Sequence, residues 1–317
     1  MRILHVSDIH YHEAPETWTL LKEAARQFEL LRPDLILITG DLTNDGLDEQ
    51  FQRVKRFISG LDFCPVLVIP GNRDQSRTIV PAPVERSDLE YFLLTHPDPM
   101  TMFEEFESPE SVNHGRQGKY FDHFDAAEFF YRERGIAAVG VNSTPEITPR
   151  QIENVTQHFN KGPASEFRIF CAHHSFLPVP TKKLRSGDVV PRAADILQSL
   201  IELNVNLLCC GHIHRSHVWE LSDGRHRLLC CNAGSLLDTS GKKDNGYLEI
   251  EVGLDVRITK RTLFSHRAEV LYHSLPLSRE VVLVDEDQPA SNGVKLPSTE
   301  QDGTEGRSKL KKAKGKR

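Results

Sequence analysis

Five short polar blocks, each placed directly after an apolar stretch, set the strongest constraint on the fold of this chain. The blocks are Asp8–His10, Gly40–Asp41, Gly71–Asp74, His173–His174 and Gly211–His214. The stretches before them are rich in Val, Ile and Leu, which is typical of buried β-strands. Parallel strands end at the same edge of a sheet, so a fold with parallel strands brings such blocks together.

The first seventy residues alternate between apolar runs and helical patterns. Strands are predicted at residues 2–8, 34–41 and 65–71. Apolar residues recur at helical spacing between these strands, and we expect the first helix to stop before Pro33 and the second at Gly60. This β-α-β-α-β order predicts parallel strands, and open sheets of this kind bind ligands beyond the carboxyl ends of their strands.

Regular patterns return after residue 135. Strands are predicted at residues 136–142, 167–172 and 205–210, and helices at residues 149–159 and 193–203. Residues 226–271 contain several more strands separated by turn residues, and we expect them to pair antiparallel on a second sheet. The chain is therefore expected to have an α/β fold.

Length and composition indicate one large domain with a polar tail. We expect the domain at residues 1–284, with a cap-like insertion at 76–134 where Pro, His, acidic and aromatic residues replace the regular pattern. Residues 285–317 are polar, end in a basic run, and are predicted to be disordered. Such a basic end is either a contact for nucleic acid or an anionic membrane, or a solvated chain end, which is the commoner case. The net charge of −6 argues against a basic footprint over the whole surface.

The sequence contains no signal-peptide pattern and no apolar run of membrane-spanning length. Its six cysteines have no Cys-x-x-Cys spacing, and four of them form adjacent pairs inside apolar runs. Buried, reduced thiols and a cytoplasmic location are the expectation.

The residue types in the five blocks are those that bind metal ions. Oxygen and imidazole nitrogen ligands suit Mn, Fe or Zn. Side chains alternate along an extended chain, so Asp8 and His10 are predicted to face one side and to bind metal together, as are His212 and His214. Asp41 follows a glycine and can offer both carboxylate oxygens to two cations. Two neighbouring cations activate a bridging water and hold a phosphoryl group, which predicts hydrolysis of a phosphoester or phosphoanhydride.

The ordered set of blocks resembles the calcineurin-like metallophosphoesterases, whose pattern is Asp-x-His, Gly-Asp, Gly-Asn-His-(Asp/Glu), His and Gly-His-x-His. The resemblance extends from residue 1 to about residue 270 and implies a four-layer α/β/β/α sandwich of two mixed sheets flanked by helices. It implies one metal held by Asp8, His10, Asp41 and His214, and a second held by Asp41, Asn72, His173 and His212. The run Val139–Ser143 and the His-His pair are most similar to the class III cyclic-nucleotide phosphodiesterase branch.

One position departs from this pattern, because Arg73 stands where most members have the histidine of Gly-Asn-His. That histidine is the group thought to protonate the leaving oxygen, and arginine, with a pKa above about 12, does not act as an acid near neutral pH. A guanidinium can instead neutralise charge on a phosphoryl or leaving oxygen. The Gly-Asn-Arg-Asp run resembles UDP-diacylglucosamine pyrophosphohydrolases, although those enzymes generally have His-Gly-Asp where this chain has His-His-Ser at 173–175.

The leading hypothesis is a phosphohydrolase whose metal-bridging water attacks a phosphodiester or pyrophosphate bond of a small, nucleotide-like substrate. Asp41 bridges the metals in this hypothesis, and Arg73 binds the phosphate or leaving group. His174 is either a catalytic residue or a neighbour held by the backbone. The alternative proton donors are His5, His12 and His114. Alternative functions are a phosphomonoesterase and a non-catalytic metal-binding scaffold of the same fold; lost ligands would mark a scaffold, whereas all seven are present here.

Overall fold

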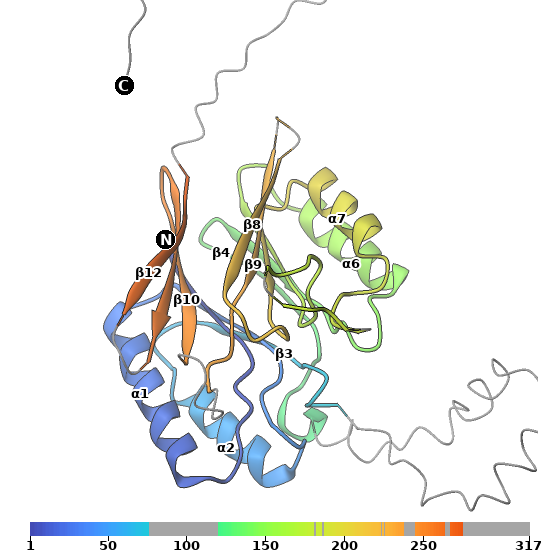
Figure 1. The fold of residues 1–317 in the computed structure, drawn as a ribbon. Helices are drawn as coiled ribbons and strands as arrows, with labels where there is room; N and C mark the ends of the chain where they lie inside the picture. Colours follow the sequence, from blue (N-terminus) through green and yellow to red (C-terminus); the bar gives the residue numbers. More distant parts are fainter. Residues whose placement is uncertain are drawn as a thin grey trace, which may run out of the picture. The chain divides into compact units, whose positions relative to one another are not determined.

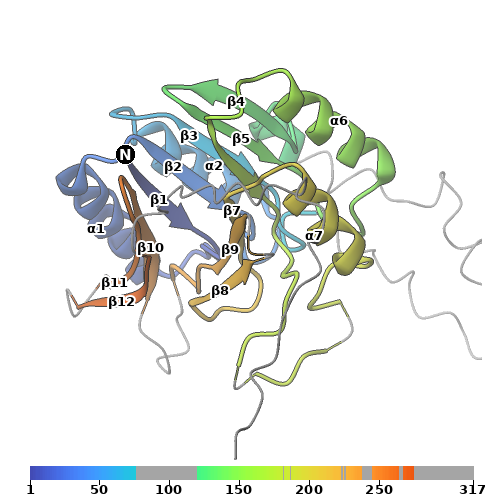
Figure 2. The same ribbon diagram turned by 90° about the horizontal axis from the view of Figure 1, so that it is seen from above.

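Two six-stranded sheets stack face to face in this computed structural model, with helices on their outer sides (Figures 1 and 2). The structure describes residues 1–75 and 120–274, except residues 181, 186, 223, 225, 238–244 and 264–266. The arrangement confirms the predicted α/β/β/α sandwich of two mixed sheets flanked by helices.

The first sheet has a parallel half and an antiparallel half. Its strands, in spatial order, are β12 (Ala268–His273), β11 (Val256–Thr262), β10 (Gly246–Val252), β1 (Arg2–Val6), β2 (Leu35–Thr39) and β3 (Val66–Ile69). Strands β1, β2 and β3 are parallel, as predicted. The prediction that the late strands form a second sheet is wrong for β10, β11 and β12. They extend the first sheet, because β10 pairs antiparallel with the edge of β1 that β2 leaves open.

The second sheet is mainly parallel. Its spatial order is β4 (Phe129–Glu133), β5 (Ile136–Gly140), β6 (Phe167–Cys171), β7 (Leu207–Cys210), β9 (Arg227–Asn232) and β8 (His217–Ser222). Strand β4 falls inside the predicted insertion 76–134 and pairs with β5, so the end of that segment belongs to the sheet. Residues 76–119 and the predicted tail 285–317 lie outside the described residues, and the predicted domain bounds stay a prediction.

Helices cover the two outer faces. Helix α1 (Pro15–Leu31) and helix α2 (Asp48–Ser59) lie on the first sheet, and helix α6 (Pro149–Asn160) and helix α7 (Ala193–Glu202) lie on the second (Figure 2). Helix α1 has proline in its first turn, where no backbone donor is needed, and helix α6 starts with a capping box between Thr148 and Gln151.

Strand β2 shows why the strand ends are fixed in position. Leu35 and Leu37 pack between the sheets, whereas Ile36 and Ile38 pack under helices α1 and α2. All four side chains are at most 1% exposed. Strand β2 also pairs in register with β1 on one side and β3 on the other, so ladder hydrogen bonds and close packing on both faces fix the point at which the next residue emerges.

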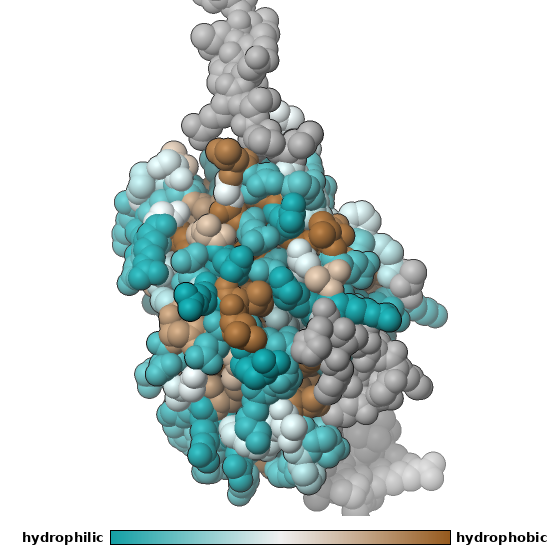
Figure 3. All heavy atoms as spheres, turned by 90° about the vertical axis from the view of Figure 1, so that its left-hand side faces the viewer, coloured by the Kyte–Doolittle hydropathy of each residue, from teal (hydrophilic) through white to brown (hydrophobic). Residues whose placement is uncertain are grey.

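The outer surface differs from this interior. The face that presents α1 and β12 is largely hydrophilic, with hydrophobic side chains in small, separate groups (Figure 3). Among the described residues, no helix combines the length and the apolar character needed to cross a bilayer. The six cysteines are free, and five of them are buried, in agreement with the expectation of buried thiols.

Phe28 offers a test of the packing of α1 on the first sheet. Its side chain is fully buried, and its ring lies edge-on to Tyr247 at 4.8 Å between centroids. Phe28→Ala should lower the free energy of unfolding by about 3–5 kcal/mol because it leaves a cavity. Leu30→Ala, on the same helix at 68% exposure, should change it by less than about 0.5 kcal/mol. Urea denaturation measures both, and equal small effects would contradict this packing.

Candidate metal centre

The predicted metal ligands all lie just beyond strand ends. Asp8, Asp41 and Asn72 follow β1, β2 and β3, and His173 follows β6. The block with His212 and His214 follows β7. Backbone hydrogen bonds join these loops: Asp8 N donates to Gly40 O at 3.0 Å, and Gly211 N donates to His173 O at 2.9 Å. The carboxyl ends of both sheets thus bring the five blocks together, as the parallel topology predicts.

The backbone of these loops is not extended. Nine non-glycine residues of the described chain have positive φ, and five of them are predicted ligands: Asp8, His10, Asp41, His212 and His214. The side chains of Asp8 and His10 do lie close together, as expected. The expected reason, an extended chain, is wrong because both residues have positive φ. Left-handed backbone at such residues costs about 1–3 kcal/mol each and is found mainly at functional sites.

Two glycines allow the loops after β2 and β3 to touch. Gly40 has φ of +90°, and a Cβ there would lie 2.5 Å from Gly71 N. A Cβ on Gly71 would collide with the backbone and the carboxylate of Asp41. Close backbone approach therefore explains the glycine at position 71.

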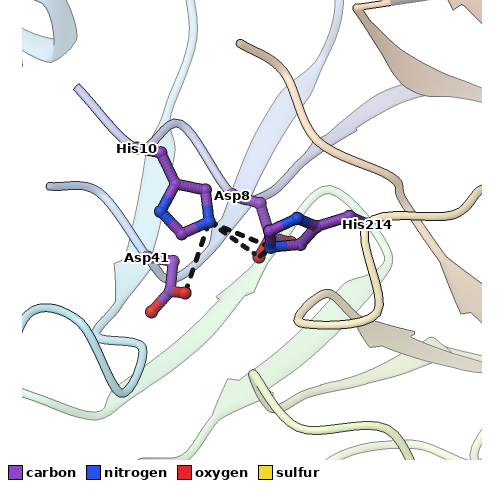
Figure 4. Close-up of side chains that lie close together, drawn as sticks. All are labelled: Asp8, His10, Asp41 and His214. Atoms are coloured by element: carbon purple, nitrogen blue, oxygen red, sulfur yellow. Dashed lines mark hydrogen bonds and ion pairs between the residues drawn. The ribbon is translucent and has the colours of Figure 1, made fainter. Parts of the chain in front are cut away.

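Asp8, His10, Asp41 and His214 form the first group of side chains, which we call the Asp8 cluster (Figure 4). Each offers one ligand atom, and these atoms lie within 4.8 Å of one another. His214 Nε2 is 3.0 Å from both Asp8 Oδ1 and His10 Nε2. Two imidazole nitrogens and buried carboxylates thus converge on one point (Figure 4).

Asp41, His173 and His212 form the second group, the His173 cluster. Asn72 joins it through its side-chain oxygen, which lies 3.1 Å from His173 Nε2 and 3.0 Å from His212 Nδ1. His173 Nδ1 lies 2.8 Å from the carbonyl oxygen of Thr39. A carbonyl oxygen can only accept a hydrogen bond, so Nδ1 is the donor and carries a proton. In the neutral ring, the Nε2 lone pair of His173 is therefore directed at the cluster.

Asp41 belongs to both clusters. Its Oδ2 lies 3.5 Å from His10 Nε2 in the first, and its Oδ1 lies 3.4 Å from His173 Nε2 in the second. The carboxylate is only 2% exposed, and the backbone N–H of Arg73 donates to Oδ1 at 2.8 Å. A carboxylate in this position has one oxygen available to each cluster.

The electrostatics of the clusters fit a cation. Burial alone would lower the pKa of His173, but the charge of Asp41 and a hydrogen bond to it raise the pKa to about 9. Burial likewise opposes ionisation of Asp8, yet His10 and His214 hold its pKa well below the usual value. Buried negative charge here raises the pKa values of His10 and His173, and a metal ion bound by oxygen and nitrogen would compensate the same charge.

Asp74 holds the loop that carries Asn72 and Arg73. Its buried carboxylate accepts backbone N–H groups from Leu42, Thr43 and Gly71 at 2.9–3.0 Å. It thereby ties the Gly71–Asp74 block to the residues that follow Asp41. Within the described part of the chain, the Arg73 guanidinium has no hydrogen bond or ion pair.

His174 lies beside the His173 cluster without joining it. Ser143 Oγ is 2.9 Å from His174 Nδ1 and accepts the His174 backbone N–H at 3.1 Å. Burial, together with the charges of His173 and His212, lowers the pKa of His174 to about 3, so the ring is neutral at neutral pH.

The other histidines considered as proton donors differ in position. His5 is fully buried, and its Nε2 is 3.0 Å from Thr39 Oγ1. His12 Nδ1 lies 3.2 Å from the backbone oxygen of His10, at the border of the Asp8 cluster. His114 lies outside the described residues.

Sequence reasoning assigned no role to two polar residues that contact the candidate ligands or their neighbours. Ser143 holds His174, and Asp188 Oδ1 lies 3.4 Å from His212 Nε2. Asp188 is 24 residues before His212 and belongs to no motif. Only the run Val139–Ser143, noted for its resemblance, pointed to Ser143.

A cavity of about 430 Å³ lies next to this region. Its lining is polar and includes Glu128, Asn142, Arg150 and Gln151. Asn142 links it to the candidate centre, because the Asn142 side-chain oxygen accepts from Gln75, the residue after Asp74, at 2.7 Å. Asn142 therefore belongs both to the cavity lining and to the hydrogen bonds of the loop that follows β3.

Curated relatives of the chain include two phosphodiesterases. A probable glycerophosphodiester phosphodiesterase, GpdQ, of Arcobacter nitrofigilis is 23% identical over 193 residues, which is 58% of each chain. A probable cyclic nucleotide phosphodiesterase of Synechococcus sp. is 32% identical over 82 residues, or 24% of this chain and 32% of the relative. The chain therefore spans less than two thirds of the length of either relative.

Solved structures share the fold at low sequence identity. The purple acid phosphatase PPD1 of yellow lupin (Lupinus luteus) superposes with a TM-score of 0.58 and 11% identity, covering 86% of this chain and 53% of that one. A dimetal phosphatase of Danio rerio superposes with a TM-score of 0.57 and 11% identity, covering 86% and 99%. The sequence matches the family described as Calcineurin-like phosphoesterase over residues 1–216, and the chain therefore belongs to the calcineurin-like phosphoesterase family.

Proposed function

We propose that this protein is a dinuclear-metal-dependent phosphohydrolase that cleaves a phosphodiester or pyrophosphate bond in a small, nucleotide-like substrate. The observation that supports this most is Asp41, whose two carboxylate oxygens face two separate groups of ligand atoms. A single metal site would need only one of these groups.

The two clusters supply the ligands in this proposal. The Asp8 cluster would hold one ion, and the His173 cluster with Asn72 would hold the other. Mn, Fe and Zn all suit these oxygen and nitrogen donors. A metal pair of this kind activates water and stabilises negative charge on a phosphoryl group.

Arg73 would bind the phosphoryl or leaving oxygen. Its backbone is fixed by Asp41, while its guanidinium has no partner among the described residues and is available to substrate. A guanidinium neutralises charge but donates no proton at neutral pH. An arginine at position 73 therefore favours a leaving group that is already a weak base, such as a phosphate or an aryl oxide.

The substrate class is inferred from the relatives and from the polar cavity. Both curated relatives are named as probable phosphodiesterases. The cavity beside Asn142 has amide, carboxylate and guanidinium groups in its lining, and these groups would hydrogen-bond to a sugar-like or nucleoside-like portion of a substrate. Pyrophosphate-linked nucleotides and activated phosphodiesters are the substrates that combine such a portion with a good leaving group.

Two alternatives use the same site. A phosphomonoesterase would need the same metals but no space for a second ester group, whereas the polar cavity offers such space. A non-catalytic scaffold would have no need for a complete ligand set, whereas both clusters retain every predicted ligand.

Removal of the shared carboxylate tests the metal assignment. Asp41→Ala should release both metals, because the repulsion between two cations would no longer be offset, and should lower kcat/KM more than His10→Ala does. Metal content per chain and turnover of an aryl phosphodiester are the measurements. Asp62→Ala, which removes an exposed aspartate, is the matched control. Wild-type metal content or near-normal turnover in Asp41→Ala would contradict the assignment of Asp41 as the ligand shared by both metals.

The leaving-group preference follows from Arg73. Without a general acid, rates should fall steeply as the pKa of the leaving group rises, and alkyl diesters should react more slowly than aryl esters by up to about 10²–10⁴-fold. Arg73→His should selectively raise the rate on alkyl diesters and lower it on pyrophosphates. Arg73→Lys, which keeps the charge, should give no such gain. A series of esters measures this slope, and a shallow slope in the wild type would show that another residue supplies the proton.

A further inference from the structure

The segment before helix α7 contacts the Gly211–His214 block at two points. Lys182 Nζ donates to the carbonyl oxygen of Ile213 at 3.2 Å. Asp188 Oδ1 lies 3.4 Å from His212 Nε2. Residues 182–188, apart from residue 186, therefore lie against the loop that bears two of the candidate ligands.

The orientation of the His212 ring gives the Asp188 contact its significance. His212 Nδ1 faces the His173 cluster, 3.0 Å from Asn72 Oδ1. The two nitrogens of an imidazole point in different directions, so Nε2 faces away from the cluster and towards Asp188. A neutral imidazole that binds a metal through Nδ1 must have its proton on Nε2, and that proton needs an acceptor.

Asp188 is itself held in place. The residue is 8% exposed, its Oδ2 accepts the backbone N–H of Arg185 at 2.8 Å, and its own N–H donates to Arg185 O at 3.2 Å. Two residues on, Val190 N donates to Ser175 O at 2.9 Å, next to the His173–His174 block. The carboxylate is thus presented to His212 by a turn that is fixed to the strand-end loops.

We propose that Asp188 is a positioning residue for His212: it accepts the Nε2 proton and so directs the Nδ1 lone pair into the His173 cluster. The inference rests on the proposed function, since it requires that this cluster hold a metal ion. Thr39 O takes the same part for His173. The two imidazoles of the cluster would then be oriented by different acceptors, a neutral carbonyl for His173 and a carboxylate for His212. A carboxylate acceptor also raises the basicity of the ligand nitrogen.

Metal titration tests this role directly. Full-length protein is freed of metal and titrated with Mn²⁺, and calorimetry gives the affinity of each site. Asp188→Ala should weaken binding at one of the two sites by about 10–100-fold and leave the other unchanged. Asp188→Asn should weaken metal binding at that site less than Asp188→Ala does, because the amide oxygen still accepts a hydrogen bond. Asp195→Ala removes an exposed aspartate of helix α7 whose carboxylate lies 3.1 Å from Arg192 Nε, and it should change neither affinity.

A second measurement separates positioning from a general structural role. In the metal-free protein, the ¹⁵N shifts of the imidazoles should show His212 protonated at Nε2 in the wild type and in Asp188→Asn, and as a mixture of the two tautomers in Asp188→Ala. Equal affinities in wild type and Asp188→Ala would overturn the inference and leave the proposed function intact. Equal weakening of both sites, or a His212 proton on Nδ1, would also overturn it. A wild-type protein that binds no Mn²⁺ would overturn both.

Discussion

The carboxylate of Asp41 is the group on which the rest of the site depends. It is almost fully buried, and its two oxygens face His10 on one side and His173 on the other. An isolated buried carboxylate would be strongly unfavourable. The fold can bury Asp41 only because imidazoles, or the metal ions proposed to bind there, compensate its charge. The glycine at position 71 is a second condition, because any side chain there would displace the carboxylate.

The two sheets supply the rigidity that such a site needs. Five candidate ligands have positive φ, at a cost of about 1–3 kcal/mol each, and a loop on its own would relax. Central strands that pair on both sides and pack on both faces have a fixed register, and their ends hold the loops in these conformations. The hydrogen bonds of Asp74 and Thr39 then fix individual loops and rings. The packed core therefore holds the ligand loops in their strained conformations.

Much of this could be predicted from the sequence. The apolar runs before Asp8, Asp41 and His173 located the strands, and parallel topology placed the ligands at one edge. Three features could not be predicted, because no local sequence pattern marks them. Positive φ at residues other than glycine is imposed by tertiary contacts, the pairing of β10 with β1 joins segments some 250 residues apart, and Asp188 reaches His212 only through the folded turn. Such features depend on long-range packing, which periodicity does not encode.

Anomalous X-ray diffraction from crystals of the Mn²⁺-loaded protein would show whether Asp41 joins two metal ions, because it locates metal ions without reference to activity. We expect two peaks, one among Asp8, His10, Asp41 and His214 and the other among Asp41, Asn72, His173 and His212, with Asp41 contacting both. A single peak, or two peaks without Asp41 between them, would contradict this expectation.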